Sequence, residues 1–382
     1  MKALSPYKEA ADIIIEQGGE QLKLCYQCGL CSSICPWNLV RTFLVRRTMH
    51  QAQMGLVEFE AEEAWLCATC RACVERCPRG VEIIDVMRAI RRTIVETGIG
   101  PVPDALRITI KNISGVGNPL GEEREKRADW AKDLDVKAFT EGTELLYFPC
   151  CIPAYDPRGK KVAQAIVSIL KKAEIDFGIL GTEETCCGES VRKAGNEALF
   201  QSLAQSNIAV FTEKGVQKIL TTSPHCYNTF KNEYHELDGK FEVIHYTQYF
   251  AQLIKEGRLK FSKELNKRVT YHDPCYLGRH NGIYDEPREV LQSIPGLELV
   301  EMRDSRENSL CCGGGGGRIW MDTKKEERFS DLRVDQAIEA GAQALVASCP
   351  YCILNFEDSV LTMDKADVLE VKDISELVQE AI

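Results

Sequence analysis

The sequence contains no apolar run long enough to cross a membrane. Its longest apolar stretches are interrupted by charged residues or glycine, whereas a spanning helix needs about 20 mostly apolar residues. The sequence also lacks an excess of basic residues, because 57 aspartates and glutamates outnumber 47 lysines and arginines and leave a formal net charge of −10. We therefore expect no transmembrane segment and no general affinity for nucleic acid.

Signals for secretion and for nucleotide binding are missing as well. Residues 1–20 lack the apolar core of a signal peptide, so the 18 cysteines are expected to be reduced and available to metal. No Gly-x-Gly-x-x-Gly loop follows a predicted strand, and the five glycines 313–317 precede Arg318 and Ile319 rather than Lys-Ser or Lys-Thr. Any flavin or nicotinamide should then belong to a partner. The glycine run instead indicates backbone that approaches a metal cluster closely.

The cysteines form two kinds of array, and the first is a run of four that ends before proline. It occurs twice in the N-terminal part of the chain. In bacterial two-cluster ferredoxins the last cysteine of each such run ligates the other cluster. A zinc knuckle, built from paired Cys-x-x-Cys units, fits less well. We therefore predict two [4Fe-4S] cubanes, one held by Cys25, Cys28, Cys31 and Cys77, the other by Cys67, Cys70, Cys73 and Cys35.

Helical periodicity surrounds these runs, at residues 6–17, 38–55, 61–67 and 82–97. Residues 1–98 are thus predicted to form an α-helical two-cluster ferredoxin, and residues 99–143, rich in glycine and proline, a structured connector. Several arginines near the runs either offset cluster charge, receive an acidic partner or form a solvated helix face. These are Arg41, Arg46, Arg47, Arg71, Arg76 and Arg79.

The second kind of array is spread over longer intervals and is repeated in tandem. Its complete copy consists of Cys275, Cys311, Cys312, Cys349 and Cys352. The earlier copy has Cys150, Cys186 and Cys187, each 125 residues before its counterpart, then Ser223 and Cys226, with Cys151 as an extra thiol. A serine oxygen is a poorer ligand for iron than a thiolate. We therefore predict two lobes, residues 144–265 with an altered array and residues 266–382 with a complete one.

Short apolar segments alternate with helical patterns through both lobes. Strands are predicted at residues 145–148, 177–180, 218–221 and 242–245, and again at 269–272, 297–302 and 344–347. Strands that alternate with helices form parallel sheets, so each lobe is predicted to be α/β. The cysteines of the complete array fall at or just after strand ends, where open α/β sheets place their sites.

Two ferredoxin runs followed by two Cys-Cys-Gly steps resemble the heterodisulfide reductase catalytic-subunit family, in the form that fuses both parts. The layout is also similar to the iron-sulfur subunits of glycolate oxidase and anaerobic glycerol-3-phosphate dehydrogenase. The resemblance implies a noncubane [4Fe-4S] cluster at the complete array, whose five cysteines would be the catalytic residues. In that family both arrays are complete and a disulfide is reduced between them. Here Ser223 makes the first array incomplete. The first lobe is therefore expected to bind a further [4Fe-4S] cluster or another metal, and its candidate ligands are Cys150, Cys151, Cys186, Cys187 and Cys226.

Taken together, these features predict an iron-sulfur electron-transfer subunit of an anaerobic redox complex. It would pass electrons between the cubanes and the noncubane cluster, with thiol–disulfide chemistry at the second lobe as a nested hypothesis. His225 and His272, next to cluster cysteines, either deliver protons there or simply hydrogen-bond to backbone. Expected partners are a flavoprotein or cytochrome b subunit, an electron-transfer flavoprotein or hydrogenase-type subunits, in the cytoplasm or at a membrane surface.

One alternative is a relay subunit of a flavin-dependent dehydrogenase, which delivers electrons to quinone or to an electron-transfer flavoprotein without substrate chemistry of its own. A zinc-dependent structural scaffold is a third hypothesis, and it predicts a colourless protein. The sequence does not distinguish the direction of electron flow, since potentials depend on charge, hydrogen bonds and exposure around each cluster.

Overall fold

The computed structural model describes residues 5–59 and 61–382, which divide into two compact units. The first unit contains the described part of residues 1–108 together with Ser190–Phe200 and Gly313–Phe329. The second contains Thr109–Glu189, Gln201–Cys312 and Ser330–Ile382. The two short segments of the first unit follow the Cys-Cys-Gly steps of the two repeats. Each repeat therefore sends the segment after its step into the ferredoxin unit.

The first unit is helical, as predicted. Its helices are α1 (Lys8–Ile14), α2 (Leu30–Ile34), α3 (Val45–Met54), α4 (Glu63–Leu66), α5 (Ala72–Glu75) and α6 (Ile83–Thr97). Helix α6 buries Val86, Met87, Ile90 and Ile94 on one face and ends at Gly98, whose φ of 68° only glycine adopts readily.

The helix predicted at residues 38–55 is shorter than the pattern indicated. Only α3 is α-helical, and a 3-10 turn, Pro36–Leu39, precedes it. The Asn38 side chain accepts a hydrogen bond from the Phe43 N–H and donates one to the Phe43 carbonyl oxygen. These local bonds close a loop where the apolar spacing alone favoured a helix.

The predicted connector also contains a helix, α7 (Asp104–Val116). Pro101 and Pro103 lie just before it, and Gly117, with a φ of 75°, lies just after it. Proline is tolerated at a helix start and glycine favours a helix end. The residues that indicated a connector therefore mark the ends of a helix.

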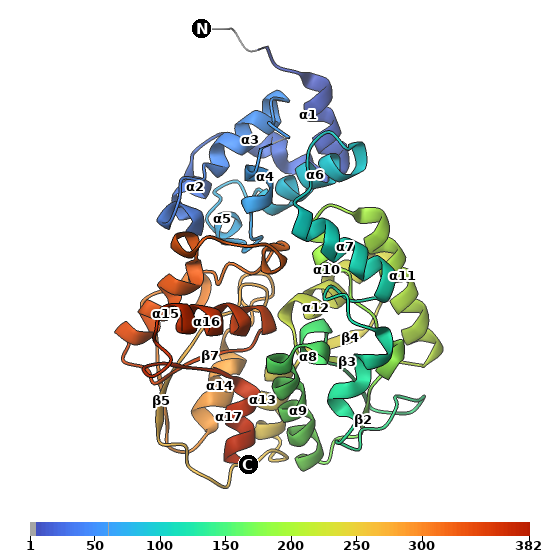
Figure 1. Ribbon diagram of the computed structural model, residues 1–382, viewed down its shortest axis with the longest axis vertical. Coiled ribbons are helices and arrows are strands. Elements are labelled where there is room, and N and C mark those ends of the chain that lie inside the picture. Colours follow the sequence, from blue (N-terminus) through green and yellow to red (C-terminus); the bar gives the residue numbers. More distant parts are fainter. Residues whose placement is uncertain (1–4, 60) are drawn as a thin grey trace. The chain divides into compact units, whose positions relative to one another are not determined.

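The second unit contains two four-stranded parallel sheets with the same topology (Figure 1). The first sheet has the order β2-β1-β3-β4 and the second β6-β5-β7-β8. The predicted pair of parallel α/β lobes is confirmed. The strands are β1 (Leu145–Phe148), β2 (Phe177–Gly178), β3 (Lys218–Thr221), β4 (Glu242–His245), β5 (Lys267–Tyr271), β6 (Leu297–Val300), β7 (Ala344–Ala347) and β8 (Glu370–Asp373).

Strand β8 is an edge strand that the sequence analysis missed. Three of its four residues, in Glu370-Val-Lys-Asp373, are charged, so neither alternation nor an apolar run marks it. It forms because it pairs in parallel with β7, which is fully buried. Helix α17 (Ile374–Ala381) follows it at once, and the Asp373 carboxylate caps that helix by accepting from the Ser375 N–H.

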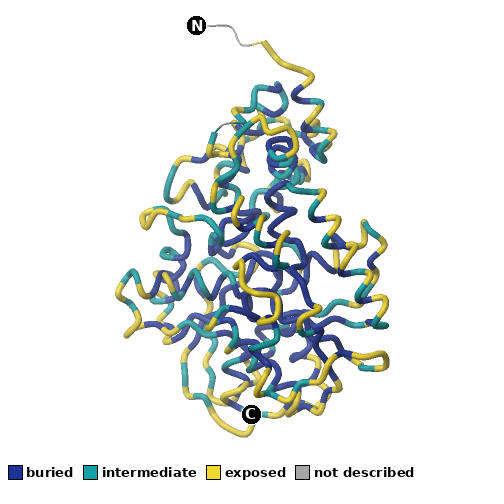
Figure 2. Tube along the Cα trace, turned by 45° about the vertical axis from the view of Figure 1, so that its right-hand side comes forward, coloured by how far each residue is buried: buried dark blue, intermediate teal, exposed yellow. Residues whose placement is uncertain are grey.

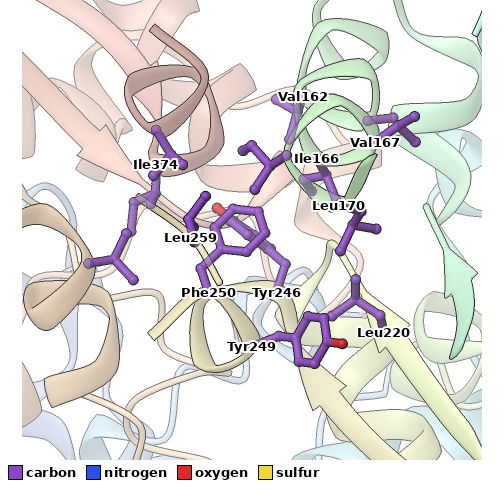
Figure 3. Packing of buried hydrophobic residues seen from close by; sticks show 14 of the residues in the cluster. Val162, Ile166, Val167, Leu170, Leu220, Tyr246, Tyr249, Phe250, Leu259 and Ile374 are labelled. Carbon is purple, nitrogen blue, oxygen red and sulfur yellow. The ribbon is translucent and has the colours of Figure 1, made fainter. Parts of the chain in front are cut away.

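Helices cover the sheets, and their apolar faces lie in more than one buried cluster. The helices of this unit and of the segments that leave it are α8 (Cys151–Tyr155), α9 (Pro157–Lys172), α10 (Glu189–Lys193), α11 (Glu197–Glu213), α12 (Pro224–Asn228), α13 (Tyr246–Lys255), α14 (Asp285–Ser293), α15 (Phe329–Glu339), α16 (Pro350–Thr362) and α17. The largest cluster of buried apolar side chains contains Ile166 and Leu170 of α9, Phe250 of α13 and Ile374 of α17, so it joins both lobes (Figure 3).

The loops that follow the strands of the second unit are buried. Figure 2 colours the chain by the burial of each residue. All ten cysteines of the two lobes are buried, whereas Cys28 of the ferredoxin unit is exposed and most of its other cysteines are partly so. No helix in residues 5–59 and 61–382 combines the length and the apolar character that a membrane span needs.

Candidate metal centres

One cavity of the first unit is lined by Cys25, Cys28, Cys31 and Cys77, the four cysteines predicted to share a cubane. Cys25, Cys28 and Cys31 lie in and just before α2, and Cys77 follows α5. Burial and the charge of the Cys25 thiol raise the pKa of Cys31 to about 11. Thiols that hinder one another's ionisation become thiolates when a cation is present, so this group suits a metal cluster.

A second cavity is lined by Cys35, Cys67, Cys70 and Cys73. Cys35 comes from the first run and has crossed to the cysteines of the second, as the ferredoxin pattern predicts. Burial and the charges of Cys70 and Cys67 raise its pKa. The structure thus gathers the eight cysteines into the two predicted sets of four, while their ligation of iron stays a prediction.

The arginines near these cysteines have different surroundings. Arg46 and Arg79 line the first cavity, where they can offset the charge of thiolates. Arg41, Arg47 and Arg71 form ion pairs with glutamates of the same unit. Arg71 also lines the second cavity, so the predicted role in balancing cluster charge is supported by position for Arg46, Arg79 and Arg71.

The glycine run packs on the loop that carries the second cysteine set. A Cβ atom on Gly315 would lie 2.3 Å from the carbonyl oxygen of Ala68, and one on Gly316 would lie 2.4 Å from that of Cys67. Both distances are too short for any side chain, so this approach requires glycine. The run was predicted to lie close to a metal cluster. The backbone that it approaches belongs to a predicted cluster loop.

Arg91 of α6 joins these segments of the first unit. It is 1% exposed, and its guanidinium donates to the carbonyl oxygens of Ala64, Cys67, Lys193 and Gly316 at distances of 2.7–2.9 Å. Lys193 and Gly316 belong to the two segments that follow the Cys-Cys-Gly steps. Sequence reasoning missed Arg91, because its partners lie 24 to 225 residues away.

The cysteines of the second repeat gather where β5 and β7 end. The sulfurs of Cys352 and Cys312 are 3.2 Å apart. Cys349 hydrogen-bonds with Cys352, and Cys311 with Cys312, so four of the five predicted ligands are in contact. The fifth, Cys275, follows β5, the strand that pairs with β7. Hydrogen bonds from Cys311 and Cys352 hold the pKa of Cys312 well below its usual range, despite burial.

His272 lies against the same thiols with a fixed tautomer. Arg333 donates from Nε to Nδ1 of His272 at 3.2 Å. An arginine can only donate, so Nδ1 is the acceptor and the proton of the neutral ring is on Nε2. Burial lowers the pKa of His272, which keeps the ring neutral. The predicted alternative, a ring hydrogen-bonded to backbone, is wrong for His272.

The Nε2 atom of His272 is buried, and the ring hydrogen-bonds with the Cys312 thiol. A ring nitrogen of His272 and the sulfurs of Cys312 and Cys352 all lie within 4.8 Å of one another. A buried ring N–H needs an acceptor in a native protein. A cluster held by these cysteines would supply sulfur acceptors for it, so the second-lobe residues fit such a group.

The cysteines of the first repeat are also in contact with one another. The sulfurs of Cys187 and Cys226 are 3.3 Å apart, and Cys226 hydrogen-bonds with Cys150 as well. Cys151 hydrogen-bonds with Cys186. These five thiols are buried and form no disulfide, so they fit a metal cluster by the same argument.

A buried ion pair borders the first-lobe thiols. Arg127 and Glu184 are each 2% exposed, and the guanidinium of Arg127 also donates to the Cys151 sulfur at 3.4 Å. Arg127 therefore offers the lobe a fixed positive charge beside a candidate ligand. Neither residue was predicted, because Arg127 lies in a run of charged residues that is typical of a solvated helix face.

The Ser223 hydroxyl makes a helix cap. Its hydroxyl oxygen accepts a hydrogen bond from the His225 N–H at 3.3 Å and so caps α12. Cys349, its counterpart before α16, makes no such cap. The serine oxygen is thus committed to the helix terminus.

His225 connects the two lobes. Its Nδ1 lies 3.0 Å from a carboxylate oxygen of Glu189, and its ring packs on Tyr276 and Tyr351 with centroid distances of 4.2 and 4.3 Å. Burial opposes its charging, yet Glu189 and the Cys349 thiol raise the pKa of His225 to about 10. A backbone partner is again the wrong prediction. Glu189 directly follows the first Cys-Cys-Gly step, and sequence reasoning missed its pairing with His225.

Two protein-family models match the chain. A cysteine-rich domain matches residues 145–231 and 269–357, and a 4Fe-4S dicluster domain matches residues 21–81. The matches cover both repeats and both ferredoxin runs, so the layout inferred from the cysteines is confirmed.

Three curated proteins illustrate the similarity. The chain is 36% identical to a subunit of the dihydromethanophenazine:CoB–CoM heterodisulfide reductase of Methanosarcina barkeri, over 83% of this chain and 77% of that protein. It is 38% identical to the EtfAB:quinone oxidoreductase of Syntrophomonas wolfei, and 38% to a probable iron-sulfur-binding oxidoreductase, FadF, of Bacillus subtilis. In both cases the match covers 84% of this chain but only 47% of the relative, so the chain spans about half their length.

A solved structure shares the fold at low sequence identity. A hypothetical protein from Helicobacter pylori aligns over 98% of this chain and 72% of its own, with a TM-score of 0.53 and 10% identity. At that identity the similarity concerns the fold alone.

Proposed function

We propose that this chain carries electrons between two ferredoxin cubanes and a cluster in its second lobe. The premise is that the chain belongs to the family of iron-sulfur oxidoreductases that includes the Methanosarcina heterodisulfide reductase subunit. Residues 1–98 would act as the ferredoxin domain, 99–143 as the connector, and residues 144–265 and 266–382 as the two lobes. Direction is set by the potentials of the clusters, which charge, hydrogen bonds and exposure tune.

The proposed ligands follow the groups of cysteines described above. Cys25, Cys28, Cys31 and Cys77 would hold one cubane, and Cys67, Cys70, Cys73 and Cys35 the other. The second lobe would hold a noncubane [4Fe-4S] cluster through Cys275, Cys311, Cys312, Cys349 and Cys352. When bound, these clusters supply one-electron redox chemistry, while the protein provides the thiolates, the polar contacts and the exclusion of water.

The packing of the glycine run is the observation that carries the proposal. Gly315 and Gly316 follow Cys312 by only three and four residues, and they lie on the backbone of Ala68 and Cys67. A chain segment that begins at one proposed cluster ligand thus reaches the loop of another. Such backbone contact is a short route for an electron, and the close approach leaves no room for water.

Disulfide reduction at the second lobe is a proposal nested in this one. A disulfide would accept two electrons from the chain and two protons, and two thiols would leave. His225 lies beside Cys349 with Glu189 on its other ring nitrogen, so this pair is placed to orient a bound group there. The Methanosarcina barkeri relative, by its name, belongs to an enzyme of that class.

The alternative is a relay for a flavin-dependent dehydrogenase. The 38% identity to a protein named EtfAB:quinone oxidoreductase favours it, since that name specifies electron-transfer flavoprotein and quinone. In this case the lobe clusters would pass electrons on without binding a disulfide. Reduced electron-transfer flavoprotein would then oxidise rapidly on mixing with the protein, and no disulfide would be consumed.

The partners proposed are a flavoprotein or a cytochrome b subunit, with electron-transfer flavoprotein or hydrogenase-type subunits as further candidates. A relative from Chromohalobacter salexigens, 39% identical over 87% of this chain and half of its own length, is named a probable membrane-anchored ferredoxin. That name supports the proposal that this chain reaches a membrane surface through a partner, and the cytoplasm is the compartment that we propose.

Metal analysis tests the proposal directly. We would measure iron, acid-labile sulfide and zinc in the anaerobically purified protein and record EPR spectra for wild type and Cys312→Ala. The variant is expected to lose one iron-sulfur signal and keep both cubane signals. If it kept every signal, the second-lobe site would be wrong and the chain would be a two-cubane ferredoxin with docking lobes.

A further inference from the structure

The strand register shows which cysteines of the first lobe correspond to those of the second, and the correspondence differs from the one that the sequence interval gave. Tyr147 of β1 and Tyr271 of β5 occupy the same register position against β3 and β7. The hydroxyl of Tyr147 lies 2.8 Å from that of Thr222, and the hydroxyl of Tyr271 lies 2.7 Å from that of Ser348. Thr222 and Ser348 each lie one residue before the closing cysteine motif. Tyr147 and Tyr271 are therefore equivalent.

From these tyrosines the chain leads to different cysteines than the spacing suggested. Cys275 follows Tyr271 by four residues, and the residue four after Tyr147 is Cys151, not Cys150. The sequence interval had paired Cys150 with Cys275, and the strand register replaces that pairing.

The first helical turn after each strand gives the same alignment. The carbonyl oxygen of Cys150 accepts from the Ala154 N–H, as that of Pro274 accepts from the Gly278 N–H. Cys150 is thus the counterpart of Pro274 and has no equivalent cysteine in the second lobe. Cys151 is the first residue of its turn, as Cys275 is of the other.

The contacts of Cys150 match those of a different cysteine, Cys349. In the second lobe Cys352 hydrogen-bonds with Cys312 and Cys349. In the first lobe the equivalent thiol, that of Cys226, hydrogen-bonds with Cys187 and Cys150. Cys150 therefore stands toward this pair of thiols as Cys349 does, although it comes from a different strand.

The backbone of Cys150 is distorted at this point. Its φ of 77° and ψ of 172° are values that residues other than glycine rarely adopt. Such strain persists at functional sites when the surrounding structure requires it. The distortion adds a thiol beside Cys226, while the serine at position 223 is occupied as a helix cap.

We propose that the first lobe holds an iron-sulfur cluster with five thiolate ligands, in which Cys150 takes the place of the cysteine missing at position 223. Cys151, Cys186, Cys187 and Cys226 then correspond to Cys275, Cys311, Cys312 and Cys352. This inference rests on the proposed function, which assigns a five-thiolate cluster to the second lobe. The chain would then have two matched cluster sites on either side of His225. This favours disulfide reduction over the relay function proposed as the alternative.

Two substitutions test the exchange. Cys150→Gly removes the thiol but adopts the positive φ without strain, so any effect reports the ligand and not the backbone. We expect the anaerobically purified variant to lose one iron-sulfur EPR signal, with a matching loss of iron and acid-labile sulfide. The double variant Cys150→Gly with Ser223→Cys places a thiol where the second lobe has one, and should recover both the signal and the metal.

Either of two results would overturn the exchange. One is full iron content and an unchanged first-lobe signal in Cys150→Gly, with Cys226→Ala as the variant that identifies that signal. The other is a folded double variant, by circular dichroism, that recovers neither metal nor signal. Cys312→Ala, measured alongside, reports the second lobe. Retention of all signals in that variant refutes the proposed function itself, and so the two failures are distinguishable.

Discussion

Replacing His272 by phenylalanine is expected to lower the reduction potential of the cluster proposed in the second lobe. The Arg333 contact leaves the ring proton on Nε2, next to the sulfurs of Cys312 and Cys352. An N–H donor stabilises sulfur most when the cluster carries its extra electron, and it therefore raises the potential. Phe148 holds the equivalent position of the first lobe, so a phenylalanine is compatible with this site in the fold.

The magnitude follows from the strength of one hydrogen bond. A hydrogen bond to a charged acceptor contributes about 1.5–3 kcal/mol. The oxidised cluster accepts the same hydrogen bond more weakly. We take the difference in hydrogen-bond free energy between the reduced and the oxidised cluster as ~1 kcal/mol. For a one-electron couple 59 mV corresponds to a tenfold change in the equilibrium constant, so the potential should fall by about 40 mV.

An EPR-monitored redox titration of wild type and His272→Phe would measure the shift. The cubane signals in the same samples are internal controls, and their potentials should not move. Phenylalanine keeps the edge-on contact with Phe356, whose ring centroid is 4.8 Å from that of His272. The loss of an acceptor for Arg333 should cost about 1–2 kcal/mol of folding stability. An unchanged or higher potential, at full iron content, would refute the assignment of Nε2 as a donor to the cluster.

Three further predictions concern stability. Arg91→Met should destabilise the first unit by about 3 kcal/mol or more, because several buried carbonyl oxygens lose their donor at once; a thermal melt within about 1 °C of wild type would contradict this. Glu184→Gln should cost about 3 kcal/mol in urea unfolding, since it removes the carboxylate that pairs with the buried guanidinium of Arg127. The exposed-pair control Glu58→Gln should cost less than about 1 kcal/mol. Burial raises the pKa of Asp373 to about 7, so the folded state resists its ionisation and wild-type stability should fall between about pH 4 and pH 7, by at most about 4 kcal/mol. Asp373→Asn should flatten the stability curve over that range, and an identical pH dependence in both proteins would exclude Asp373 as its source.

The sequence by itself determined the kind of protein and most of its candidate ligands. Four cysteines within eleven residues can only act through one short loop, so their spacing predicts ferredoxin clusters without knowledge of the rest of the fold. The alternation of strands with helices predicts two parallel sheets for the same reason, since each element is specified by neighbouring residues. Several elements were missed, among them helices α14, α16 and α17. Strand β8 lacked apolar periodicity, and α7 was hidden by prolines and glycines at its ends.

Only the tertiary structure decided which distant residues meet. The pairing of Arg333 with His272 and of Glu189 with His225 spans 61 and 36 residues, and the intervening spacing carries no trace of it. The roles of Cys150 and Cys151 were likewise decided only by the tertiary structure. The strand register makes Cys151, and not Cys150, the counterpart of Cys275, and the sequence interval does not reveal this. Strand register and close packing of buried side chains fix such relations, and both arise when the whole chain has folded.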